Sequence, residues 1–91
     1  MTGRAEMWEV DVPIQHPDGR RTGIHVFTGL ASDKNTAVAS ARRVVDEARE
    51  HLQNGREIPV PDRPRIDWAA RGLRPGWQLR WEDAKAHQIT L

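Results

Sequence analysis

The chain has 91 residues, a formal net charge of +1 and no cysteine. This length suffices for one domain with a narrow stability margin, since a chain this short buries only about 60–65% of its unfolded surface. The absence of cysteine excludes disulfides, thiol nucleophiles and cysteine-ligated metal centres. A charge near zero provides no general attraction for nucleic acids or anionic membranes. The sequence therefore predicts a single small domain over residues 1–91.

The composition favours a cytoplasmic protein. The first ten residues, MTGRAEMWEV, contain no apolar stretch of the kind found in signal peptides. No run in the chain approaches the ~18 apolar residues of a membrane span. Twelve arginines against two lysines, together with ten alanines, are typical of high-G+C bacteria. We therefore expect a small cytoplasmic bacterial protein that does not bind membranes.

A β-hairpin is predicted at residues 7–28. Apolar and polar residues alternate in MWEVDVPI and again in TGIHVFT, which is the period of half-buried strands. The Pro-Asp-Gly sequence between them favours a turn, because Pro fixes φ, Asp bonds its own backbone and Gly adopts positive φ. Pro13 cannot donate a ladder hydrogen bond, so the first strand is predicted to lie at an edge or to end there.

A helix is predicted at residues 33–54. Small and aliphatic residues recur three and four positions apart from Ala37 to Leu52, which gives the helix one apolar stripe. Either Ser32 or Asp33 can cap its start, since both side chains carry an oxygen that accepts an N–H of the first turn. Gly55 is a natural C-terminal stop.

The remaining third of the chain has weaker patterns. The Pro/Arg loop at residues 55–65 is predicted to be irregular, because GREIPVPDRPR contains three prolines. A short helix is predicted at residues 66–73 and a C-terminal strand region at residues 76–91. The order β-β-α-β-β gives an α+β fold, a two-layer sandwich with one long helix packed on a mostly antiparallel sheet.

Three of the four tryptophans occur within WAARGLRPGWQLRW, residues 68–81. With one Phe and no Tyr, the chain needs such rings in its core, so Trp8, Trp77 and Trp81 are predicted to face the helix. The pattern does not place Trp68. If the helix covers the other face of the sheet, Trp77 and Trp81 are exposed instead and available to stack on nucleic-acid bases.

No arrangement of residues points to catalysis. Neither serine lies in a nucleophile motif, and no phosphate-binding glycine loop is present. None of the four histidines has the spacing of a metal-ligand pair. Glu9 and Asp11 share one side of a strand, where two acids can act as a pair, but a solvated face is the simpler interpretation. We therefore expect a protein that is not an enzyme and has no catalytic residue, metal site or small-molecule cofactor.

Binding is the class of function that remains. Small domains often gain stability by association. The first and last strands of the predicted sheet would be edges that another strand can pair with. The main hypothesis is a non-catalytic protein-interaction or self-assembly module that binds a second copy of itself, as a homodimer, or another protein. The alternative is a DNA-binding accessory domain that uses the Arg/Trp-rich segment 63–81.

The same side chains are candidate contacts in both hypotheses, because exposed arginine and tryptophan are favoured anchors at interfaces and arginine also binds phosphates. They are Arg63, Arg65, Trp68, Arg71, Arg74 and Arg80. Residues 56–91 hold seven basic against five acidic residues. The interleaved acidic residues dilute the positive field that a nucleic acid requires.

The stretch WEVDVPIQHPDGRRTGIHVFT, followed by the predicted helix, resembles the arm-type DNA-binding domains of phage-like tyrosine recombinases. Those domains have a strand, an Asp-Gly-Arg turn, a second strand and a helix, and the resemblance covers residues 7–50. It implies a sheet that faces DNA. The chain departs from that pattern because no third strand precedes the helix, and because acidic Glu9 and Asp11 stand where such a sheet carries basic residues.

Overall fold

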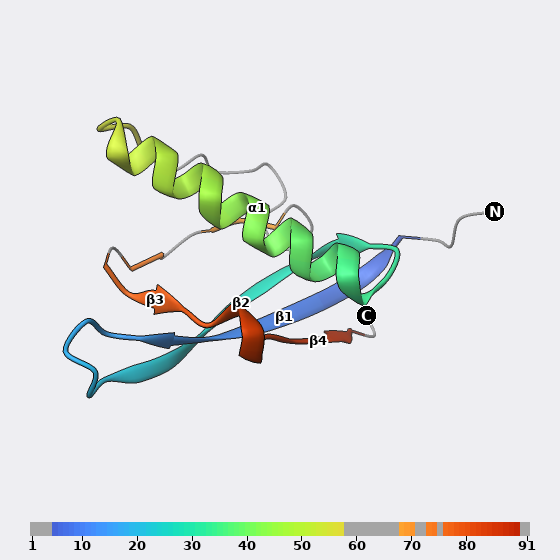
Figure 1. Ribbon diagram of the computed structural model, residues 1–91. Helices are drawn as coiled ribbons and strands as arrows, with labels where there is room; N and C mark the ends of the chain where they lie inside the picture. The colour runs from blue at the N-terminus through green and yellow to red at the C-terminus, as the bar shows by residue number, and fades with distance from the viewer. Residues whose placement is uncertain (1–4, 58–67, 71–72, 75, 90–91) are drawn as a thin grey trace.

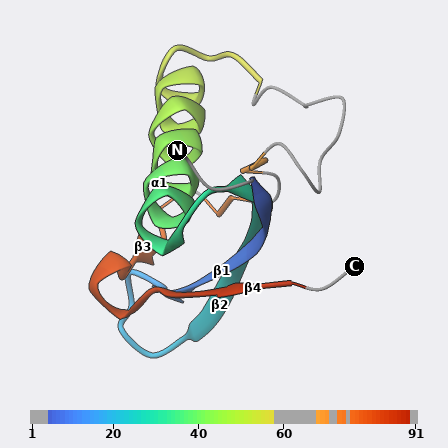
Figure 2. The same cartoon turned by 90° about the vertical axis from the view of Figure 1, so that its right-hand side faces the viewer.

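The computed structural model describes residues 5–57, 68–70, 73–74 and 76–89. Its elements are β1 (Glu6–Gln15), β2 (Thr22–Ala31), α1 (Lys34–Gln53), β3 (Gln78–Leu79), the 3₁₀ turn η1 (Trp81–Asp83) and β4 (Lys85–Gln88). The predicted α+β class is confirmed, because the described residues form one helix and an antiparallel sheet of four strands. The helix lies on one face of that sheet (Figure 1, Figure 2).

β1 is the central strand of the sheet. It pairs along its whole length with β2, and its other side pairs with β3 near one end and with β4 near the other. The prediction that Pro13 places this strand at an edge, or ends it, is therefore wrong. Pro13 lies inside β1, and its carbonyl accepts a hydrogen bond from the N–H of Arg80 at 2.9 Å. Pro13 has no N–H group to donate to Arg80. Because β3 ends one residue before Arg80, this missing donor removes a hydrogen bond only at the end of the ladder between β1 and β3.

β3 and β4 are two parts of one edge, separated by η1. The register in which β4 pairs with β1 is shifted by three residues from the register in which β3 pairs with β1, and η1 is three residues long. The predicted order of two strands, a helix and two strands therefore matches the observed order only roughly, because η1 separates the last two strands. Trp81, expected in a strand with Trp77, begins η1 instead. Residues 90 and 91 of the predicted last strand lie outside the described residues.

The predicted hairpin of residues 7–28 is slightly longer than expected, from Glu6 to Ala31. Its turn forms for the local reasons that the sequence indicates. Gly19 adopts a φ of 75°, and Oδ1 of Asp18 accepts the N–H groups of Arg20 and Arg21 at 2.8 and 3.2 Å. An aspartate that bonds the backbone two and three residues ahead is the usual way to close such a turn.

α1 matches the predicted helix of residues 33–54 closely. Oδ1 of Asp33 accepts the N–H of Thr36 at 2.7 Å, so Asp33 is the cap, and Ser32 is not. At the other end Gly55 has a φ of 69°, and the N–H of Arg56 donates to the carbonyl of His51 at 2.8 Å. This glycine and backbone bond end the helix as expected.

Two predictions concern residues that the structure covers only in part. The Pro/Arg loop of residues 55–65 is described as far as Glu57. Within the helix predicted at residues 66–73, the described residues are Trp68 to Ala70 and Leu73, and none of them is helical. Trp68 has a φ of 53°, which a helical residue does not adopt.

The core fills the space between α1 and the sheet. Val10, Val12 and Phe27 of the sheet and Val45 of the helix are its largest fully buried side chains. Alanines on the buried side of α1 let the helix backbone approach the strands closely; they are Ala37, Ala41 and Ala48. Trp8, Trp77 and Trp81 are half-buried and pack against this core, whereas Trp68, which the sequence pattern does not place, is buried within it.

Candidate functional site

β2 has one covered face and one open face. Phe27, Gly29 and Ala31 are buried on the side of α1, whereas the alternate residues Ile24, Val26 and Leu30 are 66%, 51% and 39% exposed. Among the described residues α1 is the only α-helix, and it lies on the other side of the sheet (Figure 2). The surface that carries these three side chains is called the outer face below. Apolar side chains gathered on one face in this way often mark an interaction surface.

Trp68 closes one end of the edge of β2. Its backbone N–H donates to the carbonyl of Thr28 at 3.2 Å, and its indole N–H donates to the carbonyl of Leu30 at 2.9 Å. The ring is seated over Gly29, where a Cβ atom would lie only 2.3 Å from it. Trp68 is 4% exposed, so it seals this part of the edge and has no free ring face to offer a partner.

The other end of the same edge is open. Alternate residues of a strand turn their main-chain N–H and C=O groups to the same side, so Thr22, Ile24 and Val26 present theirs beside those of Thr28. β2 pairs only with β1, and no described residue bonds the main chain of these three residues from the outer side. The segment from Thr22 to Val26 is called the open edge below.

Three side chains of metal-binding type meet on the outer face beside β2. Glu9 and Asp11 belong to β1, and His87 belongs to β4, directly opposite Glu9. Nε2 of His87 lies 3.3 Å from Oε2 of Glu9, and one ligand atom from each of the three residues lies within 4.8 Å of the others. A hydrogen bond with Asp11 raises the pKa of Glu9, and burial and the negative charge of Asp11 raise it further. These residues are called the acid–histidine cluster below.

The sequence indicates two of the three residues of this cluster. Alternation places Glu9 and Asp11 on one side of a strand, but it cannot bring His87 to them. Leu79 of β3 faces inward opposite Ile14, whereas Ala86 of β4 faces inward opposite Val10. The inward residues therefore change from odd to even numbers across the three-residue η1, and this change turns His87 outward. A strict period of two continued from Trp77 places His87 on the wrong face.

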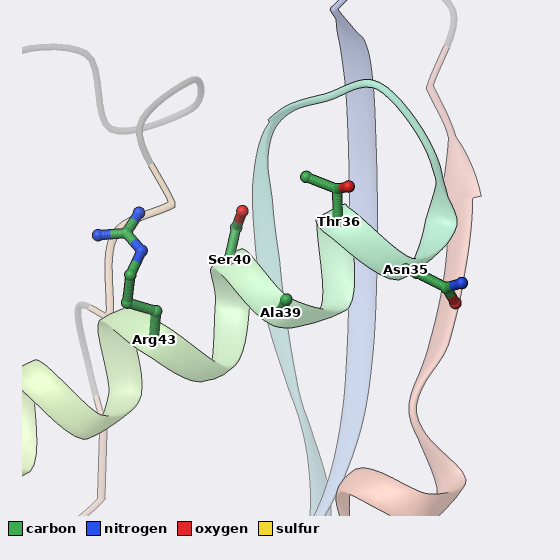
Figure 3. A pocket seen from close by; sticks show the side chains of 5 residues that line it. All are labelled: Asn35, Thr36, Ala39, Ser40 and Arg43. Atoms are coloured by element: carbon green, nitrogen blue, oxygen red, sulfur yellow. The ribbon is translucent and has the colours of Figure 1, made fainter.

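Described residues of α1 line two hollows. The first is formed along the opening turns of the helix (Figure 3), and its lining residues are Asn35, Thr36, Ala39, Ser40 and Arg43. All of these lining residues belong to one helix, so no second described element forms a wall of this hollow. Arg43 forms an ion pair with Glu47 at 3.1 Å. The second lies between the end of α1 and the chain after it; its lining residues are Arg49, Leu52, Gln53, Leu73, Arg74 and Gly76.

The predicted contact residues do not form one described surface. Arg63, Arg65 and Arg71 lie outside the described residues. Arg74 is exposed, and its guanidinium lies 4.9 Å from the ring centre of Trp77. Arg80 is exposed, and its Nε lies 3.4 Å from a carboxylate oxygen of Glu82 and from one of Asp83. The arginine charge at position 80 is therefore offset by its own neighbours.

Comparison of the chain with protein-family models, curated proteins and solved structures finds no match. The likeness of residues 7–50 to recombinase arm-type domains therefore stays a resemblance. Within the described part of the chain, no helix is both long and apolar enough to span a bilayer.

Proposed function

We propose that this chain is a self-assembly module in which β2 of one copy pairs with β2 of a second copy through the open edge. Two features of Thr22–Val26 together carry the proposal. Its outward main-chain groups make no hydrogen bond with any described residue, and the apolar side chains of Ile24 and Val26 face solvent. A strand edge of this kind is a template for another strand.

The composition of β2 supports this proposal. Its ten residues, TGIHVFTGLA, include no lysine, arginine, aspartate, glutamate or proline. Natural sheets commonly protect an edge with charged side chains or with proline, which prevent pairing with other chains. β2 has neither protection along the open edge, which favours a role in association.

A second copy of the chain is the partner that fits best. If two β2 strands pair antiparallel about a two-fold axis at Ile24, then Ile24 meets its own copy and Val26 meets Thr22 of the other chain. All of these side chains are uncharged and lie on the outer face of both sheets, so a self-complementary interface forms. Trp68 limits the pairing to the open edge because it already occupies the carbonyls of Thr28 and Leu30.

The expected dimer is weak. Each cross-strand pair contributes about 0.2–1 kcal/mol. Because only Thr22–Val26 of each chain takes part, the interface is expected to bury less than the roughly 1,200 Å² of stable complexes. A dissociation constant on the order of 10–100 μM is expected, which corresponds to about 6 kcal/mol of binding free energy and requires the inter-strand main-chain hydrogen bonds in addition to these side-chain pairs. Analytical ultracentrifugation from low to high micromolar concentration covers this range.

The test compares variants that place a charge on the open edge with a matched variant elsewhere. Val26→Lys and Ile24→Lys put an ammonium group into the proposed pairing and are expected to be monomers at every concentration. Leu52→Lys changes a side chain of similar exposure on α1 and is expected to dimerise like the unaltered chain. A chain that stays monomeric at high micromolar concentration, or a Val26→Lys variant that still dimerises, contradicts the proposal.

The same samples address the nucleic-acid alternative. Labelled duplex and single-stranded DNA are titrated with the unaltered chain at low and at high salt. If the chain stays monomeric and its affinity for DNA falls steeply as salt rises, DNA binding replaces self-assembly as the proposed function. A steep salt dependence is the sign of phosphate contacts, because these contacts release counterions.

A further inference from the structure

The acid–histidine cluster lies on other strands than the open edge, because its three residues come from β1 and β4. Glu9 and Asp11 stand two positions apart on the central strand, and His87 stands across from Glu9 on the neighbouring strand. A paired sheet fixes the relative positions of their Cα atoms, so only side-chain torsions decide how closely the three groups approach.

The spacing of these groups suits a bound cation. Two ligand atoms on a tetrahedral zinc ion, with bonds of about 2.0–2.2 Å, lie about 3.3–3.6 Å apart. Nε2 of His87 and Oε2 of Glu9 are 3.3 Å apart. The remaining separations lie within 4.8 Å, and torsions of the exposed imidazole and the neighbouring carboxylates can shorten them without moving the strands.

A second observation concerns Asp11 itself. Its Oδ1 atom is buried and has no hydrogen-bond partner among the residues that the structure describes. A buried polar atom without a partner is rare in folded proteins, and each instance needs a physical explanation. Glu9 and Asp11 also place a carboxylate oxygen each within 4.8 Å of the other, and two carboxylates this close repel each other unless a proton or a cation offsets the charge.

We infer that Glu9, Asp11 and His87 bind one divalent transition-metal ion of the zinc type, and that this ion fastens β4 to β1. Two carboxylate oxygens and an imidazole nitrogen are donors that first-row transition ions accept, whereas calcium and magnesium prefer oxygen donors alone. β4 has only four residues and lies at an edge of the sheet, so a metal–ligand bond from His87 strengthens its attachment to β1.

Lys85 is the competing source of positive charge. It stands directly opposite Asp11 in the register of β1 and β4, and it is exposed. Its ammonium group would repel a cation at the cluster. Lys85→Gln is therefore expected to tighten zinc binding if the cluster is the metal site, and an unchanged zinc affinity would argue that the ion binds elsewhere.

The direct test is calorimetric titration of the tag-free, metal-stripped chain with zinc chloride. One zinc ion per chain is expected to bind. Glu9→Gln, Asp11→Asn and His87→Gln are each expected to weaken the binding at least tenfold, because each removes a ligand and keeps a similar shape. Glu47→Gln and His51→Gln, which change the same residue types on α1, are the matched controls and are expected to keep the affinity of the unaltered chain.

Two further measurements give readouts that do not depend on the heat of binding. Cobalt replacing zinc is expected to show the visible absorption bands of low-coordinate cobalt, and these bands are lost in His87→Gln. Zinc is expected to raise the melting temperature of the unaltered chain in proportion to the logarithm of free zinc, since the ion binds the folded state. Circular dichroism of each variant shows that it is folded before it is titrated.

The inference is overturned by either of two results. One is the absence of saturable zinc binding to the folded, unaltered chain. The other is zinc binding that all three cluster variants retain at full strength, which would place the ion elsewhere on the chain. Neither result bears on the oligomeric state, so the proposed self-assembly is tested separately.

Discussion

Trp68 combines an unfavourable backbone with a favourable environment. Its φ of 53° is left-handed, which for a bulky residue costs about 1–3 kcal/mol. Its ring is buried, and its backbone and indole N–H groups both bond carbonyls of β2. Burial of an indole and two hydrogen bonds more than offset the backbone cost. The sequence pattern does not place Trp68, because the contact joins residues about forty positions apart and depends on a glycine in another strand.

Gly29→Ala tests this packing. The new Cβ would lie 2.3 Å from the indole ring, so the ring must move, and we expect the free energy of unfolding to fall by about 1–3 kcal/mol. Gly23→Ala is the control in the same strand, since its Cβ would lie 3.5 Å from Ile14, an ordinary contact. Urea denaturation measures both variants, and an equal loss in the two would mean that the contact with Trp68 is not the cause.

His25 is a second residue with a measurable consequence. Its ring centre lies 4.4 Å from that of Phe27, and burial lowers the pKa of His25, with a smaller contribution from the charge of Arg74. The unfolded chain gains this proton near the ordinary pKa of about 6.5, and the folded chain gains it only at lower pH. The contribution of His25 to the free energy of unfolding is therefore fully present above about pH 6.5 and is lost as the pH falls below that value.

His25→Gln is expected to flatten this decline between pH 7 and pH 5. Thermal melts of the unaltered chain and the variant across that range give the two slopes. Glutamine at position 25 does not titrate. If the melting temperatures of the two chains fall equally between pH 7 and pH 5, groups other than His25 cause the loss of stability in acid.

At the scale of elements, α1 shows what local signals can predict. Its apolar stripe, its capping residue and its terminal glycine all lie within the helix or beside it, so the predicted residues 33–54 differ from Lys34–Gln53 by one residue at each end. β3 and β4 depend on pairing with β1 and on the interruption by η1. Neither is encoded in the alternation of GWQLRWE, and the continuous strand predicted there is instead two residues long.

The choice between two capping residues, which the sequence leaves open, gives a prediction for α1. Asp33→Ala removes the side chain that accepts the N–H of Thr36, and we expect the melting temperature to fall by about 4–8 °C. Ser32→Ala is expected to leave it unchanged, since the serine makes no capping bond in the described structure. Melts followed by circular dichroism compare the two, and a larger effect at Ser32 would reverse the assignment.

At the scale of the whole molecule, one helix covers one face of a sheet whose central strand is the first. The sequence predicts both layers but leaves open which side of the last strands the helix covers. That choice is settled by the register of β3 and β4 against β1, which places Leu79 opposite Ile14 and Ala86 opposite Val10 on the side of the helix. The candidate surfaces follow from the same register, and alternation within one strand could indicate only Glu9 and Asp11.

Association through the open edge has a consequence for the stability of the molecule. A partner that binds only the folded state raises the melting temperature with its concentration. We therefore expect the melting temperature of the unaltered chain to rise between low and high micromolar protein, and that of Val26→Lys to stay constant. Scanning calorimetry at several concentrations measures this, and parallel behaviour of the two chains would argue against pairing at this edge.

The three residues of η1 also limit how the chain can change in length. Adding or deleting one residue between Arg80 and Lys85 would rotate every side chain of β4 to the opposite surface, moving His87 under the helix and Ala86 into water. A change of two residues would preserve the arrangement. Natural or engineered variants of this turn are therefore expected to differ in steps of two, which is an unusual constraint for an exposed connection where insertions are normally tolerated.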